Sequence, residues 1–265
     1  MLELLEQLFR HVRAYIHSER FNESQVYAES PEHTTMLFDY EAEEIIIKEL
    51  TESGIGFEIV TEERPVLCTS DAPTYRIVID PVDGSMNVSR GVMTAGVALA
   101  VLPIDAPITP TNVQWALVGE LFSGTVYQAQ QGGGAFRNGH RCQVSQATHF
   151  AECMAGVNFD GRDTETLRKL IIQQPPLGRV RRSGSSAMDI VYVASGAYDA
   201  YIDIGNVLTA ESFLASLSIV LEAGGIVTAQ HGQPLRNATN LREVFSLVAA
   251  GTQELHAEIL ARIDG

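Results

Sequence analysis

The stretch YRIVIDPVDGSMNVSRG, residues 75–91, carries the strongest structural signal in the sequence. Its first residues alternate as in a strand that runs into Asp80 and is interrupted at Pro81. Residues 83–85, Asp-Gly-Ser, then turn the chain, so two carboxylates can converge at one strand end, with the Val82 carbonyl between them. Hard divalent cations take oxygen ligands of this kind, and Mg²⁺ typically combines few carboxylates with phosphate oxygens of a substrate.

The residues alone leave two interpretations of this stretch open. Gly84-Ser85 can begin a short helix, whose free backbone N–H groups favour a phosphate. The alternative is an Asp-Pro turn followed by Asp-Gly, with no ligand.

Working outward, the pattern predicts two packed halves. In residues 1–145, two amphipathic helices, one over about 5–16 and one over about 36–50, flank a loop at 21–35 and precede a run of short strands. Residues 146–265 alternate loops, helices and strands, including a helix in TAESFLASLSIVLEAGG. We therefore expect an α+β half and an α/β half around layered sheets.

Composition narrows the class of protein. The 265 residues contain 18 Lys and Arg against 33 Asp and Glu, a formal net charge of -15, which argues against a nucleic acid or an anionic membrane as the main partner. Three scattered cysteines without a CxxC pair indicate reduced thiols in a cytoplasmic protein. The first residues mix Glu and Arg into their apolar pattern, unlike a signal peptide, and no apolar run is long enough for a membrane span.

Further motifs add context to the central stretch. The strand FEIV ends in Thr61-Glu62-Glu63, which places another carboxylate at a strand end, and GGGAFRNG follows at 132–139. RRSGSSAMD, YDAYID and EAGG follow in turn. Together these strings resemble the inositol monophosphatase family, whose superfamily also holds fructose-1,6-bisphosphatases and bisphosphate nucleotidases. The resemblance covers about 70% of the chain, from Phe38 to Gly225, and implies an αβαβα layered sandwich, the sugar-phosphatase fold.

The family motif D-P-[IL]-D-G-[TS]-x-N is matched at residues 80–87, and its G-E-E is matched with Thr61 in place of Gly. The resemblance implies that Glu62, Asp80 and the Val82 carbonyl hold a first Mg²⁺ and that Asp80 and Asp83 hold a second. Two or three Mg²⁺ ions are expected in all. A carboxylate cluster in an acidic chain is tolerable only where a cation occupies it.

The resemblance also implies catalytic roles. Ser85 stands where the family has Thr or Ser, and Asp39 stands where it has the Asp that pairs with that hydroxyl. The resemblance implies that the pair orients and deprotonates the attacking water on the first Mg²⁺, which Glu62 helps to hold. Alternatively, Asp39 simply faces solvent on its helix. Cations would neutralise the phosphate dianion and stabilise the leaving oxygen.

Substrate contacts are implied on two sides. Asp83, Gly84 and Ser85 would face the phosphate, and Gly184-Ser185-Ser186 matches a family segment at a helix N-terminus near substrate hydroxyls and phosphate. Asp203 stands where the family has a residue that contacts a ring hydroxyl. The alternatives are ordinary N-capping for Ser185 and Ser186 and a surface position for Asp203.

The sequence departs from the family at its second metal site. There the family has W-D-x-A-A-G-x-L-I-x-x-E-A-G-G, whereas this chain has Leu-Thr-Ala-Glu-Ser-Phe at 208–213. Counting back from Glu222 puts Ser212 at the Asp position, and counting forward from Asp203 puts Ala210 there, which indicates a local insertion. We expect Glu211 to replace the Asp, the alternative being a purely structural carboxylate at the helix N-terminus.

These features predict a Mg²⁺-dependent phosphomonoesterase that acts on a small polyol or sugar phosphate, most simply an inositol monophosphate. Fructose-1,6-bisphosphatase, histidinol-phosphatase and bisphosphate nucleotidase activities stay open, as does a catalytically impaired relative that only binds a phosphorylated ligand. By analogy with the family we expect a homodimer. A loop lysine of many relatives is missing here, where His33 or Glu32 could take its place.

Overall fold

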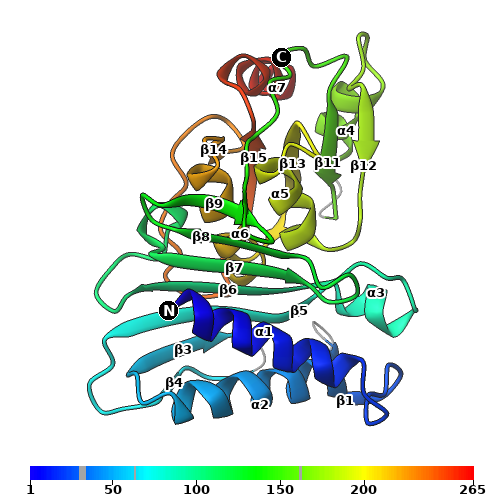
Figure 1. Ribbon diagram of the computed structural model, residues 1–265. Helices are drawn as coiled ribbons and strands as arrows, with labels where there is room; N and C mark the ends of the chain where they lie inside the picture. The colour runs from blue at the N-terminus through cyan, green and yellow to red at the C-terminus, as the bar shows by residue number, and fades with distance from the viewer. Residues whose placement is uncertain (30–33, 63, 161–162) are drawn as a thin grey trace.

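Helices and sheets alternate in five layers in the computed structural model, which describes residues 1–29, 34–62, 64–160 and 163–265 (Figure 1). The αβαβα sandwich expected from the sequence is confirmed. The helices are α1 (Leu2–Ile16), α2 (Leu37–Glu52), α3 (Ser85–Ser89), η1 (Pro110–Asn112), α4 (Thr164–Ile171), α5 (Ser186–Ala194), α6 (Ala210–Glu222) and α7 (Gln253–Asp264).

The first large sheet has eight strands in the order β10-β9-β8-β7-β6-β5-β3-β4. Most neighbours are antiparallel, but β3 and β5 run parallel, so their carboxyl ends lie at the same end of the sheet. Their bounds are β3 (Phe57–Thr61), β4 (Leu67–Cys68), β5 (Tyr75–Asp83), β6 (Gly96–Pro103), β7 (Trp115–Glu120), β8 (Val126–Gln130), β9 (Gly134–Arg137) and β10 (His140–Arg141).

Strand β5 does not end where the sequence predicted. It continues through Pro81 to Asp83 by way of a bulge, because Asp80 pairs with Ala98 while Asp83 pairs with Gly96. A bulge tolerates proline, which cannot donate to the ladder, and it re-aims the side chains beside it. The bulge therefore places both Asp carboxylates at the same end of the strand.

The remaining strands form two smaller sheets. The five-stranded sheet has the order β12-β11-β13-β15-β14. All of its strands follow residue 145, where the sequence predicted a boundary between two halves, but the division into two halves stays a prediction. The strands of this sheet are β11 (Met154–Asn158), β12 (Arg179–Arg181), β13 (Ala200–Leu208), β14 (Ile226–Ala229) and β15 (Phe245–Ala250). The expected loop at 21–35 is wrong in part, since β1 (Val26–Glu29) pairs with β2 (Thr34–Met36), while Glu32 and His33 lie outside the described residues.

Three apolar cores hold the layers together. α1 and α2 cover one face of the eight-stranded sheet, α5 and α6 fill the space between the two sheets, and α4 and α7 cover the far face of the five-stranded sheet (Figure 1). α6 is buried along nearly its whole length, because both sheets pack on it. A helix that is buried in this way carries apolar side chains around most of its circumference, and its few polar side chains need hydrogen-bond partners inside the protein.

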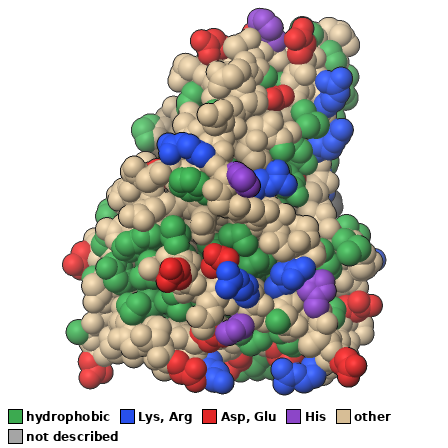
Figure 2. All heavy atoms as spheres, in the orientation of Figure 1, with side chains coloured by type: hydrophobic (Ala, Val, Ile, Leu, Met, Phe, Trp, Pro, Cys, Tyr) green, Lys and Arg blue, Asp and Glu red, His purple; other side chains and the backbone are tan. Residues whose placement is uncertain are grey.

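The outer surface carries mixed charge. On the face shown in Figure 2, acidic and basic side chains are interspersed. Among the described residues, no helix has the length and apolar character that a membrane crossing requires.

The contact between α1 and the sheet depends on Gly119 of β7. A Cβ at this position would lie 2.2 Å from the ring of Phe9, which is itself buried. We expect Gly119→Ala to lower the free energy of unfolding by about 2 kcal/mol, because an added methyl group forces the ring out of its packed position. Chemical denaturation measures this loss.

A double-mutant cycle supplies the control. In a Phe9→Leu background the smaller side chain leaves room, so Gly119→Ala should cost clearly less. An equal cost in both backgrounds would contradict the packing explanation.

Candidate active site

Carboxylates from four segments gather around Asp80, at the carboxyl end of β5. Asp80 is 6% exposed, and its pKa lies well above its ordinary value, first because of burial and then because neighbouring carboxylates repel its charge. These neighbours are, in order of effect, Asp83 on β5, Glu62 after β3, Glu211 in the first turn of α6 and Asp39 in the first turn of α2.

Parallel pairing explains the position of Glu62. Because β3 and β5 run side by side in the same direction, residues that follow β3 lie next to the end of β5. Glu62 is exposed, and its charge raises the pKa of both Asp80 and Glu211. Glu63, the next residue of the motif, lies outside the described residues.

Asp39 and Ser85 lie in hydrogen-bond contact. The Ser85 hydroxyl is 2.7 Å from Asp39 Oδ1 and 2.8 Å from the Val82 carbonyl oxygen, and the Met36 N–H donates to Asp39 Oδ2 at 3.2 Å. A hydroxyl has one proton to donate and two lone pairs that accept. While Ser85 donates to Asp39, its oxygen is able to accept a hydrogen bond from a third group. Asp39 is buried, so its expected alternative, a solvent-facing position, is wrong.

Asp83 connects the eight-stranded sheet to α5. Its Oδ2 accepts hydrogen bonds from the Ser185 hydroxyl and, at 2.7 Å, from the Ala187 N–H. Burial raises the pKa of Asp83 to about 6, although these two hydrogen bonds oppose the rise. The Ser185 hydroxyl also accepts from the Met188 N–H at 3.4 Å, so the N-capping alternative for Ser185 describes a contact that is present.

Gly84 makes this close approach possible. Its φ is +103°, and a Cβ there would lie 3.1 Å from the Thr94 carbonyl oxygen and 3.3 Å from Ser185 Cβ. Gly184 also has a positive φ, with Asn87 packed against it, and Ser186 begins α5. The N-termini of α3 and α5 thus meet beside Asp83, where helix N-terminal N–H groups favour negative charge.

The first turn of α6 presents two different groups to the site. The Ser212 hydroxyl donates to Asp80 Oδ2 at 3.3 Å. Glu211 is 3% exposed; its Oε1 accepts from the Thr209 hydroxyl, while its Oε2 is buried without a hydrogen-bond partner among the described residues. Burial, then repulsion by Glu62 and Asp83, raises the pKa of Glu211 to about 7.

Ser212 is a site contact that the sequence interpretation did not include. The signal was present, because counting back from Glu222 puts Ser212 at the family's Asp position. The Glu211 assignment as a metal ligand stays a prediction.

Asp203 lies deeper than expected. It is fully buried on β13, and its oxygens accept from Asn158 Nδ2 at 2.7 Å and from the Gly205 N–H at 3.0 Å. The alternative of a surface position is therefore wrong. Burial raises the pKa of Asp203 to about 6, and its expected contact with a substrate hydroxyl stays a prediction.

The donor set fits a hard divalent cation. Its groups are carboxylate, carbonyl and hydroxyl oxygens, and Glu211 Oε2 lacks a hydrogen-bond partner among the described residues. Burial, followed by repulsion from neighbouring carboxylates, raises the pKa values of Asp80 and Glu211. Within the described residues, no three His, Cys, Asp or Glu side chains form a ready-made metal-binding group.

Comparison with known proteins shows which family this chain is similar to. The model of the inositol monophosphatase family matches residues 1–264. A fructose-1,6-bisphosphatase/inositol-1-monophosphatase from Methanothermobacter thermautotrophicus is 34% identical over 239 residues, covering 87% of this chain and 83% of its own. An inositol-1-monophosphatase from Mesorhizobium japonicum is 30% identical over 212 residues, covering 78% and 76%.

Solved structures share the fold. A crystal structure of an inositol monophosphatase-fructose 1,6-bisphosphatase superposes with a TM-score of 0.81 at 26% identity and covers 98% of both chains. The extragenic suppressor protein suhB from Bartonella henselae gives a TM-score of 0.82 at 22% identity, covering 99% of this chain and 97% of its own.

The raised pKa of Glu211 makes folding stability depend on pH and on metal. A carboxyl whose pKa is about 7 when folded and 4.5 when unfolded binds more protons in the folded chain, so the free energy of unfolding falls as pH rises from about 4.5 to 7. We expect Glu211→Gln to stabilise the metal-free protein at pH 8 by about 2 kcal/mol and to flatten this pH dependence. Denaturant unfolding in EDTA across pH 4.5–8 measures both effects.

Mg²⁺ should reverse the order of stability. At pH 8 we expect Mg²⁺ to stabilise the wild type more than Glu211→Gln, while Glu3→Gln, an exposed change on α1, should behave as the wild type. If Mg²⁺ stabilised all three proteins equally, Glu211 would not be a metal ligand.

Proposed function

This chain belongs to the inositol monophosphatase family, and we propose that it hydrolyses the phosphate ester of a small polyol or sugar with the help of Mg²⁺. Members of this family are metal-dependent phosphomonoesterases. One observation carries the proposal: the mutually repelling carboxylates around the buried Asp80 lie beside the hydrogen-bonded Asp39–Ser85 pair. Such a cluster needs a cation, and the adjoining pair is suited to hold a water molecule.

We assign the cation-binding role to oxygens on both sides of the cluster. Two or three Mg²⁺ ions, when bound, neutralise the phosphate dianion, lower the pKa of water and stabilise the leaving oxygen. The proposed ligands are Glu62, Asp80, the Val82 carbonyl, Asp83 and Glu211.

Asp39, Ser85 and Glu62 would position the attacking water. Asp39 accepts a hydrogen bond from the Ser85 hydroxyl, whose oxygen can in turn accept a hydrogen bond from the water. As Ser85 takes a proton from the water, it gives its own proton to Asp39. Asp39 is the group that can finally hold this proton. Glu62 belongs to the same cluster, and we propose that it helps to orient the water.

The substrate would lie between the helix N-termini. Backbone N–H groups at Gly84 and Ser85 favour the phosphate, as do those of the segment 184–186. Asp83 lies between these two helix starts, and Asp203, on the neighbouring strand layer, is proposed to contact a hydroxyl of the substrate.

Members of the family are named for different phosphate esters. Relatives are named for both fructose 1,6-bisphosphate and inositol 1-phosphate, so we place both first among candidate substrates, ahead of histidinol phosphate and bisphosphate nucleotides. A cytoplasmic homodimer is the expected form.

A second candidate is a relative that binds a phosphorylated ligand without hydrolysing it. The observation that favours it is the hydroxyl of Ser212, rather than a carboxylate, in contact with Asp80. A neutral hydroxyl contributes less cation affinity than a carboxylate, so the second ion would be held weakly.

Metal removal and one substitution test the first candidate. We expect phosphate release from inositol 1-phosphate and fructose 1,6-bisphosphate in Mg²⁺, its loss in EDTA, and no detectable turnover by Asp80→Asn, which removes a ligand shared between ions. Asp71→Asn, at an exposed position, should retain activity. Turnover that survives EDTA would refute the metal mechanism, and Mg²⁺ binding by calorimetry without turnover would favour the second candidate.

The water-positioning pair has its own signature. Ser85→Ala should lower kcat by about 10²–10⁴-fold with little change in KM, because the hydroxyl acts on the water rather than on substrate binding. Ser85→Thr keeps the hydroxyl and should retain most of kcat. A large rise in KM with an unchanged kcat would show instead that Ser85 only binds the substrate.

A further inference from the structure

A groove of about 1350 Å³ adjoins the acidic site. Glu62 and Glu211 belong to its lining, together with residues of strand β3, which lies next to the edge strand β4, the segment 104–108 after β6 and the loop 237–242 before β15. We call it the edge groove. Because two proposed metal ligands form part of its wall, a molecule whose phosphate lies at the acidic site can extend into it.

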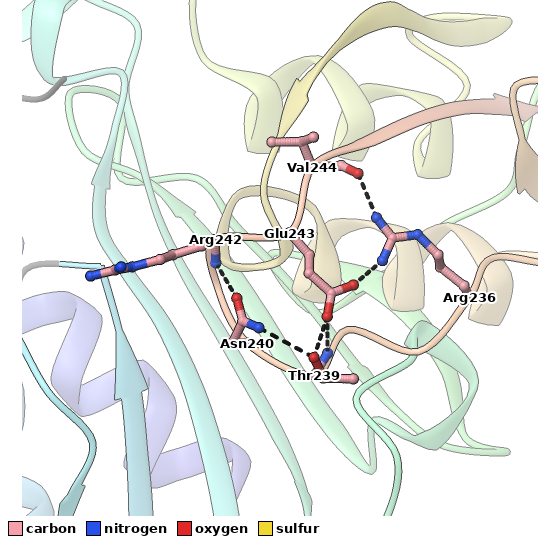
Figure 3. Close-up of polar contacts among 6 residues, drawn as sticks. All are labelled: Arg236, Thr239, Asn240, Arg242, Glu243 and Val244. Atoms are coloured by element: carbon pink, nitrogen blue, oxygen red, sulfur yellow. Dashed lines mark hydrogen bonds and ion pairs between the residues drawn. The ribbon is translucent and has the colours of Figure 1, made fainter.

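Hydrogen bonds and an ion pair hold the loop 237–242, which forms one wall of the groove. Glu243 forms an ion pair with Arg236 and accepts hydrogen bonds from the Thr239 N–H, at 3.0 Å, and the Thr239 hydroxyl (Figure 3). Arg236 also donates to the Val244 carbonyl at 2.8 Å and lies over the Phe245 ring. The Ala238 N–H donates to the Ile108 carbonyl oxygen at 3.0 Å, which ties the loop to the opposite wall.

Arg242 extends out of this network. Its backbone N–H donates to Asn240 Oδ1 at 2.9 Å, and its side chain points away from the other labelled residues (Figure 3). Within the described part of the chain, the guanidinium forms no hydrogen bond and no ion pair. Its backbone is thus fixed while its charged group stays available.

The other two arginines of the groove are already engaged. Arg64 pairs with Glu43 and Glu44, and Arg76 pairs with Glu58 and donates to the Ala106 carbonyl oxygen. In a chain with 33 acidic and 18 basic residues, an arginine that lines a groove without a carboxylate partner is available for an external anion.

We propose that Arg242 determines specificity by binding an anionic group, such as a second phosphate or a carboxylate, remote from the phosphate at the acidic site. This inference rests on the proposed function. The guanidinium presents a planar set of donors that matches phosphate and carboxylate oxygens in pairs. Asp105, on the segment 104–108, also belongs to the lining. When cations compensate Glu62 and Glu211, Arg242 is the cationic group of the wall that can bind a second anion, which favours a doubly anionic substrate over a polyol monophosphate.

The selectivity between two substrates tests the proposal. The measured quantity is the ratio of kcat/KM for fructose 1,6-bisphosphate to kcat/KM for inositol 1-phosphate, in Mg²⁺. Arg242→Ala should lower this ratio about tenfold, mainly through KM for the bisphosphate, since a charge-assisted hydrogen bond is lost. Arg242→Lys should recover part of it, and Arg10→Ala, an exposed change on α1, should leave it at the wild-type value.

A second arm distinguishes a free anion from a group of the substrate. If sulfate altered hydrolysis of inositol 1-phosphate by the wild type but not by Arg242→Ala, and the substrate ratio were unchanged, the anion bound by Arg242 would be a free one. A ratio and a sulfate response that both match the wild type would overturn the proposal.

Binding without turnover separates this inference from the proposed function. In an Asp39→Asn background, which keeps the proposed metal ligands, calorimetry with fructose 1,6-bisphosphate should show about tenfold weaker binding when Arg242→Ala is added. Equal affinities would refute the role of Arg242 even if the enzyme is active. A difference in affinity would support it even if the wild type hydrolyses none of the esters.

Discussion

The burial of several carboxylates around one point constrains the whole structure. Burial raises the pKa values of Asp80, Asp83 and Glu211, and repulsion by neighbouring carboxylates raises those of Asp80 and Glu211 further. A fold keeps such an arrangement only if something outside the chain compensates it. The bulge at Pro81, the parallel pairing of β3 with β5 and the burial of α6 between two sheets all place these groups together. The architecture thus creates an electrostatic cost that a divalent cation can remove.

Asp83 connects the acidic site to helix α5, which lies between the two sheets. Its carboxylate accepts from Ser185 and Ala187 at the start of α5, and α5 packs between the two sheets. Gly84, with φ of +103°, is required for the approach, since a Cβ would crowd Ser185. A shift of α5 would therefore reach Asp83 directly, so substrate contacts at the helix N-terminus and the carboxylate cluster cannot move independently.

Motif order and spacing predicted the layered fold and most of the residues that gather at the site. The carboxylates stand at strand ends, and the contact between Asp39 and Ser85 was expected from the matched motifs. Long-range pairing was not predictable in the same way. Asp203 is buried because β13 pairs in register with β11, which places Asn158 opposite it, and no local pattern reveals that partner. The β5 boundary was misplaced because a proline normally ends a strand, whereas a bulge accommodates it. At α6, two residue counts disagreed, and only coordinates could show that Ser212 meets Asp80.

The same local change at α6 affects both the acidic site and the edge groove. With Ser212 against Asp80, the carboxylate of this turn belongs to Glu211, whose position one residue earlier also makes it part of the groove wall. A carboxylate in that position contributes to cation binding and to the field that a substrate meets beyond the hydrolysed phosphate. Without a cation, Glu211 and Glu62 repel an anionic substituent. With a cation bound, their charge is compensated, and Arg242 can attract such a substituent. Metal occupancy and preference for a second anionic group are therefore linked through one side chain, because the charge that a cation compensates is the charge that would otherwise exclude the substrate's remote end.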